Sequence, residues 1–183
     1  KALMVGNLVF RDVNAHGTYE SGIDLPMAGV TVRLFQQAQG VTDTPVSEAV
    51  TGADGTYMLY ATSPAAYYVH IPASMFAAGA PLNGMSSVLG SGNVQPTTNA
   101  DTGKDDRFDE NGSDATQPDA TGLSAGIINL AYGSMPLNSS VTFTTGENGF
   151  DSFMDDAADD SGMMTIEFGF VRGLLLCGQP APL

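Results

Sequence analysis

The chain has 183 residues, the length of one domain, and its formal net charge of −14 comes from 20 acidic residues against 6 lysines and arginines. This acidic balance removes the attraction on which nucleic-acid binding depends, so nucleic acid is excluded as a partner and an anionic membrane is a poor one. The single cysteine excludes an internal disulfide, and with only two histidines it excludes a zinc site of the usual spacings. No apolar run approaches the roughly 20 residues of a membrane span.

Period-two alternation of apolar side chains dominates the sequence, and this pattern predicts an all-β fold. In the first predicted strand, Met4, Leu8 and Phe10 share one face, and Val5, Asn7 and Val9 lie on the other. Residues 30–34 form a second, half-buried strand.

Turn signals and a second set of alternating residues place the later strands. An Asp54-Gly55 type I′ turn is expected to join strands at 48–51 and 57–60 in a hairpin. Residues 66–71 form another strand, which Pro72 ends. The clearest core strand covers 163–171, with Met164, Ile166, Phe168 and Phe170 on one face and Thr165 and Glu167 on the other.

Between about residues 73 and 140 the composition changes to Gly, Ser, Asn, Pro and Asp. We interpret this segment as a long Gly/Asp/Ser-rich insertion in a single domain of residues 1–183, and we expect either metal or small strands to order it. Ile127, Ile128 and Leu130 are the residues of one such strand. A possible assembly tail follows at 172–183.

The first of three acidic clusters fits the spacing of a calcium loop, in which oxygen ligands alternate and a glycine occupies the sixth position. The fitting residues are Asp12, Asn14, Gly17, Thr18 through its carbonyl, and Glu20, with Asp24 following. His16 stands at position five, where a carboxylate or amide is expected. An ordinary polar loop after a strand is the alternative.

The second and third clusters are expected to bind Ca²⁺ because a cation would relieve the repulsion between their carboxylates. Solvated charged faces are the alternative. The second cluster contains Asp101, Asp105, Asp106, Asp109, Glu110, Asn111 and Asp114, and the third contains Asp151, Asp155, Asp156, Asp159 and Asp160. The residues selected as ligands are Asp105, Asp109, Asn111, Asp114, Asp155, Asp156 and Asp159.

One catalytic motif is present but lacks its context. Residues 122–126 spell the GxSxG nucleophile elbow, which requires a strand before Ser124, a helix after it and a histidine downstream. Both histidines lie upstream, and the following residues read as strand. His70 is expected to face solvent or lie at a sheet edge. We therefore expect no catalytic residues, and a protein that is not an enzyme.

Three segments in combination resemble the SdrD B-like domain, a relative of the collagen-adhesin B-type modules of bacterial surface proteins. They are residues 5–14 with Gly17, the run Ala28-Gly29-Val30-Thr31-Val32-Arg33-Leu34, and Thr51-Gly52-Ala53-Asp54-Gly55-Thr56-Tyr57. The match is clearest over residues 4–72. Residues 71–76, 128–133 and 165–171 resemble the version of the family with a long insertion.

The resemblance implies an Ig-like/transthyretin-like β-sandwich that is exported, so that the chain is a mature extracellular or cell-surface protein. It carries calcium positions over to Asp12, Asn14, Thr18 and Glu20, with Asp24 in place of a later acid, and His16 departs from the family pattern. Related modules form an internal Lys–Asn isopeptide bond. The two lysines, Lys1 and Lys104, lie outside the core strands, so we expect no such bond.

Two functional classes follow, with an enzyme or enzyme accessory domain as a third. The first is a secreted, calcium-binding structural protein, a subunit of a bacterial surface filament, stalk or layer. The alternative is an adhesin-type module that binds a host protein or a polysaccharide of the matrix.

Self-assembly is expected to proceed by β-strand addition, through either the opening strand at 2–10 or the tail with Leu174, Leu175 and Leu176. The lone Cys177 would lie at the junction between subunits. In the alternative, the tail folds back as the final edge strand of its own sandwich.

Overall fold

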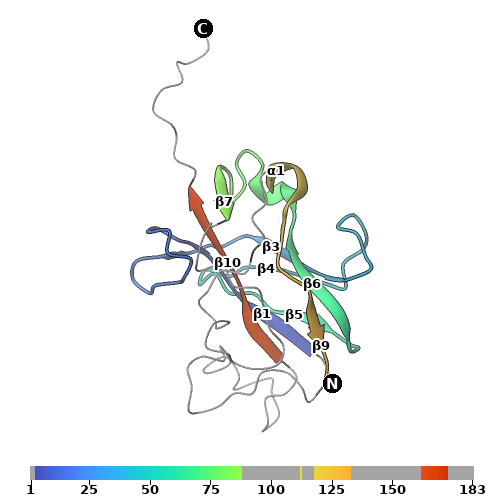
Figure 1. Ribbon diagram of the computed structural model, residues 1–183. Coiled ribbons are helices and arrows are strands. Elements are labelled where there is room, and N and C mark those ends of the chain that lie inside the picture. Colours follow the sequence, from blue (N-terminus) through green and yellow to red (C-terminus); the bar gives the residue numbers. More distant parts are fainter. Residues whose placement is uncertain (1–2, 88–111, 113–117, 133–161, 173–183) are drawn as a thin grey trace, which may run out of the picture.

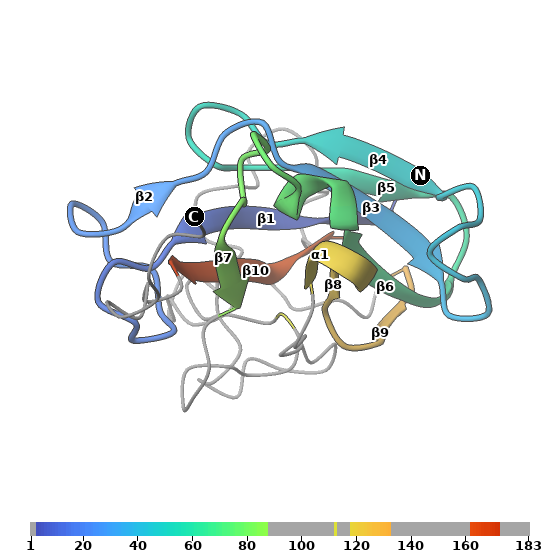
Figure 2. The same ribbon diagram turned by 90° about the horizontal axis from the view of Figure 1, so that it is seen from above.

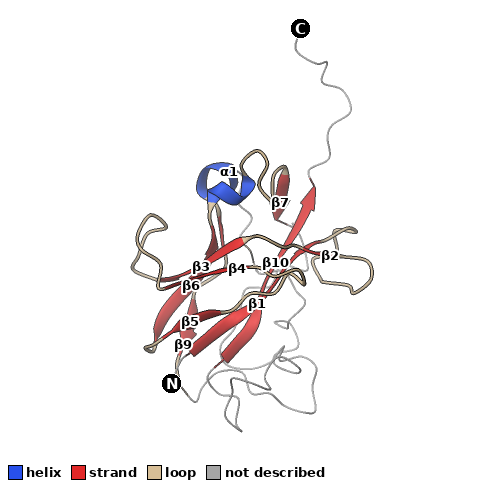
Figure 3. Ribbon diagram, turned by 180° about the vertical axis from the view of Figure 1, so that it is seen from behind, coloured by secondary structure: helices blue, strands red, loops and turns tan. Residues whose placement is uncertain are grey.

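The computed structural model describes residues 3–87, 112, 118–132 and 162–172, and in these ranges the regular secondary structure is almost all β-strand (Figure 1). Two sheets pack face to face, which confirms the all-β sandwich. The helices described are a 3₁₀ turn, η1 (Ala73–Phe76), and a single turn, α1 (Pro118–Thr121). Both lie near β7 (Met85–Ser87), at the end of the molecule where the last strand finishes (Figure 3).

The first sheet has the strand order β2-β1-β10-β7, and β5 pairs with the opening half of β1 on the same side as β2. Its remaining strands are β1 (Leu3–Arg11), β2 (Leu25–Pro26), β5 (Leu59–Ala61) and β10 (Gly162–Arg172). The first and last strands are parallel neighbours at the centre of the sheet (Figure 2). Both edges of β1 are therefore hydrogen-bonded within the chain.

The second sheet has the order β4-β3-β6-β8, with β9 also paired to β6. All pairings in this sheet are antiparallel. Its strands are β3 (Thr31–Gln36), β4 (Ser47–Val50), β6 (Ala65–Ile71), β8 (Leu123–Ser124) and β9 (Ile128–Leu130). Part of the expected insertion thus forms short strands that extend this sheet.

The core lies between the two sheets and follows the predicted alternation. From β3 it takes Val32 and Leu34, whereas Thr31 and Arg33, which alternate with them, are half-buried. Ile166, Phe168 and Phe170 contribute the core face of β10, as expected. Aromatic contacts join distant segments, for example the edge-to-face pair of Phe76 and Phe170 with ring centroids 5.7 Å apart.

The two central strands differ from the prediction in one residue and one register. Met163 lies in the core, although strict alternation with Ile166 predicts it on the opposite face. The cause is a register shift in the β1–β10 ladder between Val5 and Asn7, because a bulge moves later side chains to the opposite face. Glu167, on the face away from the core, is nevertheless fully buried.

The predicted hairpin at Asp54-Gly55 is wrong. β4 pairs with β3 in one sheet and β5 pairs with β1 in the other, so the turn crosses between sheets. Gly55 alone of the two central residues has positive φ (77°), whereas a type I′ turn requires both. An added Cβ at Gly55 would meet Val9 O at 2.5 Å, which shows that the turn is fitted against β1.

Several sequence predictions concern residues outside the described ranges. They include the second and third acidic clusters, Lys1 and Lys104, and the tail with Cys177.

Candidate metal site

The candidate calcium loop begins where β1 ends and returns to the sheet at β2, and it projects from the side of the sandwich (dark blue in Figure 1). Its first residue is fixed to the neighbouring strand, because the Asp12 N–H donates to the Phe170 carbonyl at 2.8 Å. The Asp12 side chain is only 2 % exposed. The sheet therefore places a carboxylate inside the base of the loop.

A tight turn brings the chain back over Asp12. The Gly17 N–H donates to Asp12 Oδ2 at 2.6 Å, and Gly17 has φ of 77°. A glycine adopts this left-handed conformation without the cost that a side chain imposes. The sixth position of the predicted loop thus makes the turn that the spacing required.

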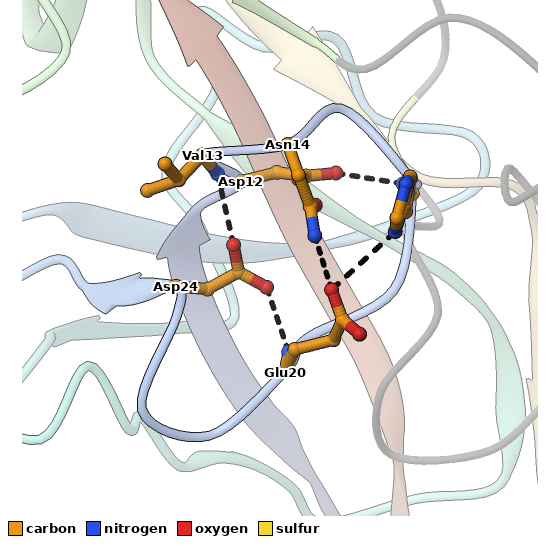
Figure 4. A network of polar contacts seen from close by, with 7 residues as sticks. Asp12, Val13, Asn14, Glu20 and Asp24 are labelled. Carbon is orange, nitrogen blue, oxygen red and sulfur yellow. Dashed lines mark hydrogen bonds and ion pairs between the residues drawn. The ribbon is translucent and has the colours of Figure 1, made fainter.

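Asp24 holds the two ends of the loop together (Figure 4). Its Oδ1 accepts a hydrogen bond from the Val13 N–H at 2.8 Å, and its Oδ2 accepts one from the Glu20 N–H at 2.7 Å. The side chain is 3 % exposed. The sequence predicted Asp24 as a metal ligand. In the structure both of its carboxylate oxygens accept backbone hydrogen bonds that hold the loop in shape.

Three further side chains meet above Asp12. Asn14 Nδ2 donates to Glu20 Oε2, and His16 Nδ1 lies 3.4 Å from the same oxygen. The His16 side chain is 64 % exposed. The Glu20 carboxylate thus contacts both the Asn14 amide and the His16 imidazole.

Two buried oxygens of the loop are left without a donor. Asp12 Oδ1 and Asn14 Oδ1 each accept no hydrogen bond from the described part of the chain. A buried acceptor without a partner costs about 1–3 kcal/mol, and more when it is charged. Ca²⁺ prefers carboxylate and amide oxygens, so these two atoms, with Glu20 beside them, are chemically suited to that ion.

The geometry also limits the candidate site. Within the described residues, no three side chains of the His, Cys, Asp or Glu type converge as a metal centre would require. Calcium also takes amide, main-chain carbonyl and water oxygens, so Asp12, Asn14 and Glu20 form an incomplete but compatible set. The Thr18 side chain is exposed, and His16 contacts Glu20.

His70 and Ser124 form a polar pair that sequence reasoning missed. They lie opposite each other in the β6–β8 ladder, and His70 Nδ1 is 2.8 Å from Ser124 Oγ. The expectation of an exposed His70 is wrong, because β8 covers it and leaves 3 % of it accessible. Burial, and secondarily the charge of Arg33, lowers its pKa to about 4. Ser124 lies on a strand paired to this histidine, as opposed to the strand-to-helix elbow of hydrolases.

Comparison with known families gives the class of the protein. The sandwich, the loop after β1 and the turn at Gly55 are accompanied by a match of residues 3–134 to the model of the SdrD B-like domain. The chain belongs to the SdrD B-like domain family, a family of bacterial surface adhesin-type modules and not of enzymes.

A search of curated proteins found no match. In the part of the chain that the structure describes, no helix has the length and apolar character needed to cross a membrane.

Proposed function

We propose that the protein is an extracellular structural module, a calcium-stabilised β-sandwich subunit of a bacterial surface filament, stalk or layer. Membership in the SdrD B-like domain family supports the surface location. The observation that carries the calcium proposal is the buried Asp12 carboxylate, whose Oδ1 accepts no hydrogen bond from the described residues. A cation at this position supplies the missing partner and neutralises a buried charge.

The residues of this loop divide into ligands and supports. Asp12 and Asn14 offer buried oxygens, and Glu20 offers a carboxylate at the mouth of the loop. Asp24 and Gly17 hold the loop closed through backbone contacts. Bound calcium would supply a fixed positive charge, and its role here is to order the loop.

Calcium binding is tested by thermal unfolding of the full chain with added Ca²⁺ and with a chelator. A ligand that binds the native state alone raises the midpoint by mass action, so the midpoint rises with Ca²⁺ concentration. Asp12→Asn keeps the size of the side chain but removes the charge, and it abolishes the shift that this loop contributes. Asp54→Asn is the matched control, because the Asp54 side chain accepts hydrogen bonds from Thr56 in an exposed turn, away from the loop.

Two outcomes contradict the calcium proposal. One is a midpoint that does not respond to Ca²⁺ at low ionic strength. The other is an equal loss of response in Asp12→Asn and Asp54→Asn, which would make the effect one of general charge. If His16→Ala is more damaging to calcium binding than Asp12→Ala, the assignment of ligands within the loop is wrong, since an imidazole is a poor ligand for a hard cation.

Self-assembly forms the second half of the proposal. Both edges of β1 are paired within the chain, so we assign strand addition to the C-terminal tail and no longer to the opening strand. Electron microscopy of native material tests this role, because ordered fibres or sheets would favour a structural subunit. Binding to a glycan or matrix array without assembly would favour the alternative, an adhesin-type module.

A further inference from the structure

A pocket of about 410 Å³ opens beside the loop, where β1 and β10 both end. The described residues that line it are Arg11, Asp12, Val13, Ala15, Ser86, Val171 and Arg172. Pockets that bind small ligands begin at about 300 Å³, so this one can hold a short stretch of peptide. Its walls come from three separate parts of the chain: the start of the loop, β7 and the end of β10.

Two arginines are concentrated at this pocket. The described residues include three arginines and no lysine, and Arg11 and Arg172 are two of the three. Arg33 differs from them, because its Nε lies 2.7 Å from Glu48 Oε2. Neither Arg11 nor Arg172 forms an ion pair with the described residues. In a chain of net charge −14, two guanidinium groups that no described carboxylate pairs with, at one pocket, need an explanation.

The strand register sets the spacing of the two arginines. Arg11 is directly opposite Phe170 in the parallel ladder, and Arg172 is two residues further along the same face of β10. Neighbouring strands are about 4.8 Å apart and a strand rises about 3.3 Å per residue, so the two Cα atoms are about 8 Å apart. In an extended peptide, side chains two residues apart share one side and are separated by about 7 Å.

The remaining walls suit a peptide better than an inorganic anion. Val13, which is 52 % exposed, contributes apolar surface together with Ala15 and Val171, and Ser86 lies opposite Val171 in the β7–β10 pair. The oxygens of Asp12 are turned into the loop, since Oδ2 accepts from Gly17 and Oδ1 is buried. A long polyanion would be repelled by the net charge of the whole chain, whereas a short acidic segment meets mainly the local field.

We propose that this pocket binds an acidic segment of a partner protein in extended conformation. Arg11 and Arg172 hold two carboxylates spaced two residues apart, and the apolar wall of Val13, Ala15 and Val171 contacts the peptide beside them. A guanidinium group pairs with a carboxylate through two parallel hydrogen bonds, so the contact fixes the orientation of the carboxylate as well as attracting it. Recognition of acidic motifs by clustered arginines is a general mode of peptide binding. This inference goes beyond the structural role proposed above.

The test is a titration of the full chain, saturated with Ca²⁺ at low ionic strength, with the peptide acetyl-GDSDG-amide. We expect amide chemical-shift changes in two-dimensional NMR at Val13, Ser86 and Val171. The uncharged peptide acetyl-GNSNG-amide produces no such changes. Arg172→Gln weakens binding about tenfold, and Arg11→Gln has a similar effect. Arg33→Gln removes the same charge outside the pocket and leaves the affinity unchanged.

Several results would overturn the proposal. They are equal binding of the two peptides, equal weakening by Arg33→Gln and Arg172→Gln, and displacement of the peptide by inorganic phosphate at the same concentration. The first two would indicate nonspecific attraction, and the third would indicate a general anion site. Arg172 is exposed, so its replacement keeps the test valid even if Arg11→Gln does not fold. Failure here leaves the calcium proposal intact, because that proposal is measured by Ca²⁺-dependent unfolding.

Discussion

His70 is a buried ionisable group that stays neutral because its surroundings oppose a charge. It is 3 % exposed, packs edge-to-face on Phe35 with ring centroids 6.1 Å apart, and contacts Ser124. Burial lowers its pKa to about 4 from the ordinary 6.5, and the charge of Arg33 adds to the effect. Protonation therefore works against the packed state of the β6–β8 pair.

The lowered pKa predicts a loss of stability in acid. The unfolded chain protonates this histidine as the pH falls below about 6.5, whereas the folded chain does so only near 4. The free energy of unfolding thus decreases between these two values by up to about 3 kcal/mol. Urea denaturation at several pH values measures the slope. His70→Asn reduces this slope, and a variant with an unchanged slope would refute the assignment.

Gly122 is required by its neighbours as well as by its backbone conformation. It follows α1 with φ of 72°, and an added Cβ would lie 2.3 Å from Ile71 O and 2.6 Å from the His70 ring. We predict that Gly122→Ala destabilises the protein by about 2–4 kcal/mol. Gly79 has φ of 83° with nothing within 4 Å, so Gly79→Ala costs only about 1 kcal/mol. Urea denaturation compares them, and equal losses would mean that backbone strain alone accounts for the effect.

At the scale of elements, β10 is held in place by the side chain of Tyr57, which lies just before β5. The buried Tyr57 hydroxyl donates to the Ile166 carbonyl at 2.8 Å. Burial, with the nearby Glu167 as a smaller cause, raises the pKa of Tyr57 well above its usual value. The phenol therefore keeps its proton and remains a donor across the whole working pH range.

Loss of this hydrogen bond should weaken the attachment of β10. Tyr57→Phe leaves the packing and removes the donor, and we predict a loss of about 1 kcal/mol in the free energy of unfolding. Tyr60→Phe is the control, since Tyr60 is 39 % exposed. Urea denaturation of both variants measures the difference. A change below about 0.3 kcal/mol for Tyr57→Phe would show that the bond adds nothing to stability.

The alternation of side chains was sufficient to predict most elements but not how they pair. Val32, Leu34, Phe168 and Phe170 lie in the core because burial of every second residue is a local property of a strand. Pairing depends on contacts between residues far apart in sequence, which alternation does not report. For this reason the hairpin at Gly55 and the exposed position of His70 were both predicted wrongly. A β-bulge, which carries no clear sequence signal, moved Met163 into the core.

The candidate site shows the same division between local and distant information. The spacing from Asp12 to Glu20 identified the loop because the residues that form it are neighbours in sequence. The backbone role of Asp24 could not be predicted, since it depends on the closed shape of the loop. Arg11 and Arg172 come from opposite ends of the chain, and only the parallel pairing of β1 with β10 brings them together.

At the scale of the whole molecule, the sandwich restricts where subunits can join. β1 pairs with β10 on one side and with β2 and β5 on the other, so the opening strand is enclosed. β10 ends at Arg172, and the sequence continues through Leu174, Leu175 and Leu176. Burial of one leucine is worth roughly 1.5–3 kcal/mol, which makes a partner surface favourable for this tail. Repeated head to tail with a rotation that closes no ring, such a contact would build a filament.

Deletion of residues 173–183 therefore separates folding from assembly. We predict that the shortened chain melts at the same temperature as the full chain, because β10 is complete, and that it no longer assembles. Size-exclusion chromatography and negative-stain microscopy measure assembly. Replacing Leu174 and Leu176 by Ser keeps the length of the tail and removes apolar area, so it weakens assembly if the leucines drive it. A full chain that stays monomeric at high concentration, or a shortened chain that assembles normally, would exclude the tail as the contact. A lower melting temperature after deletion would instead support the tail as an edge strand of its own sandwich.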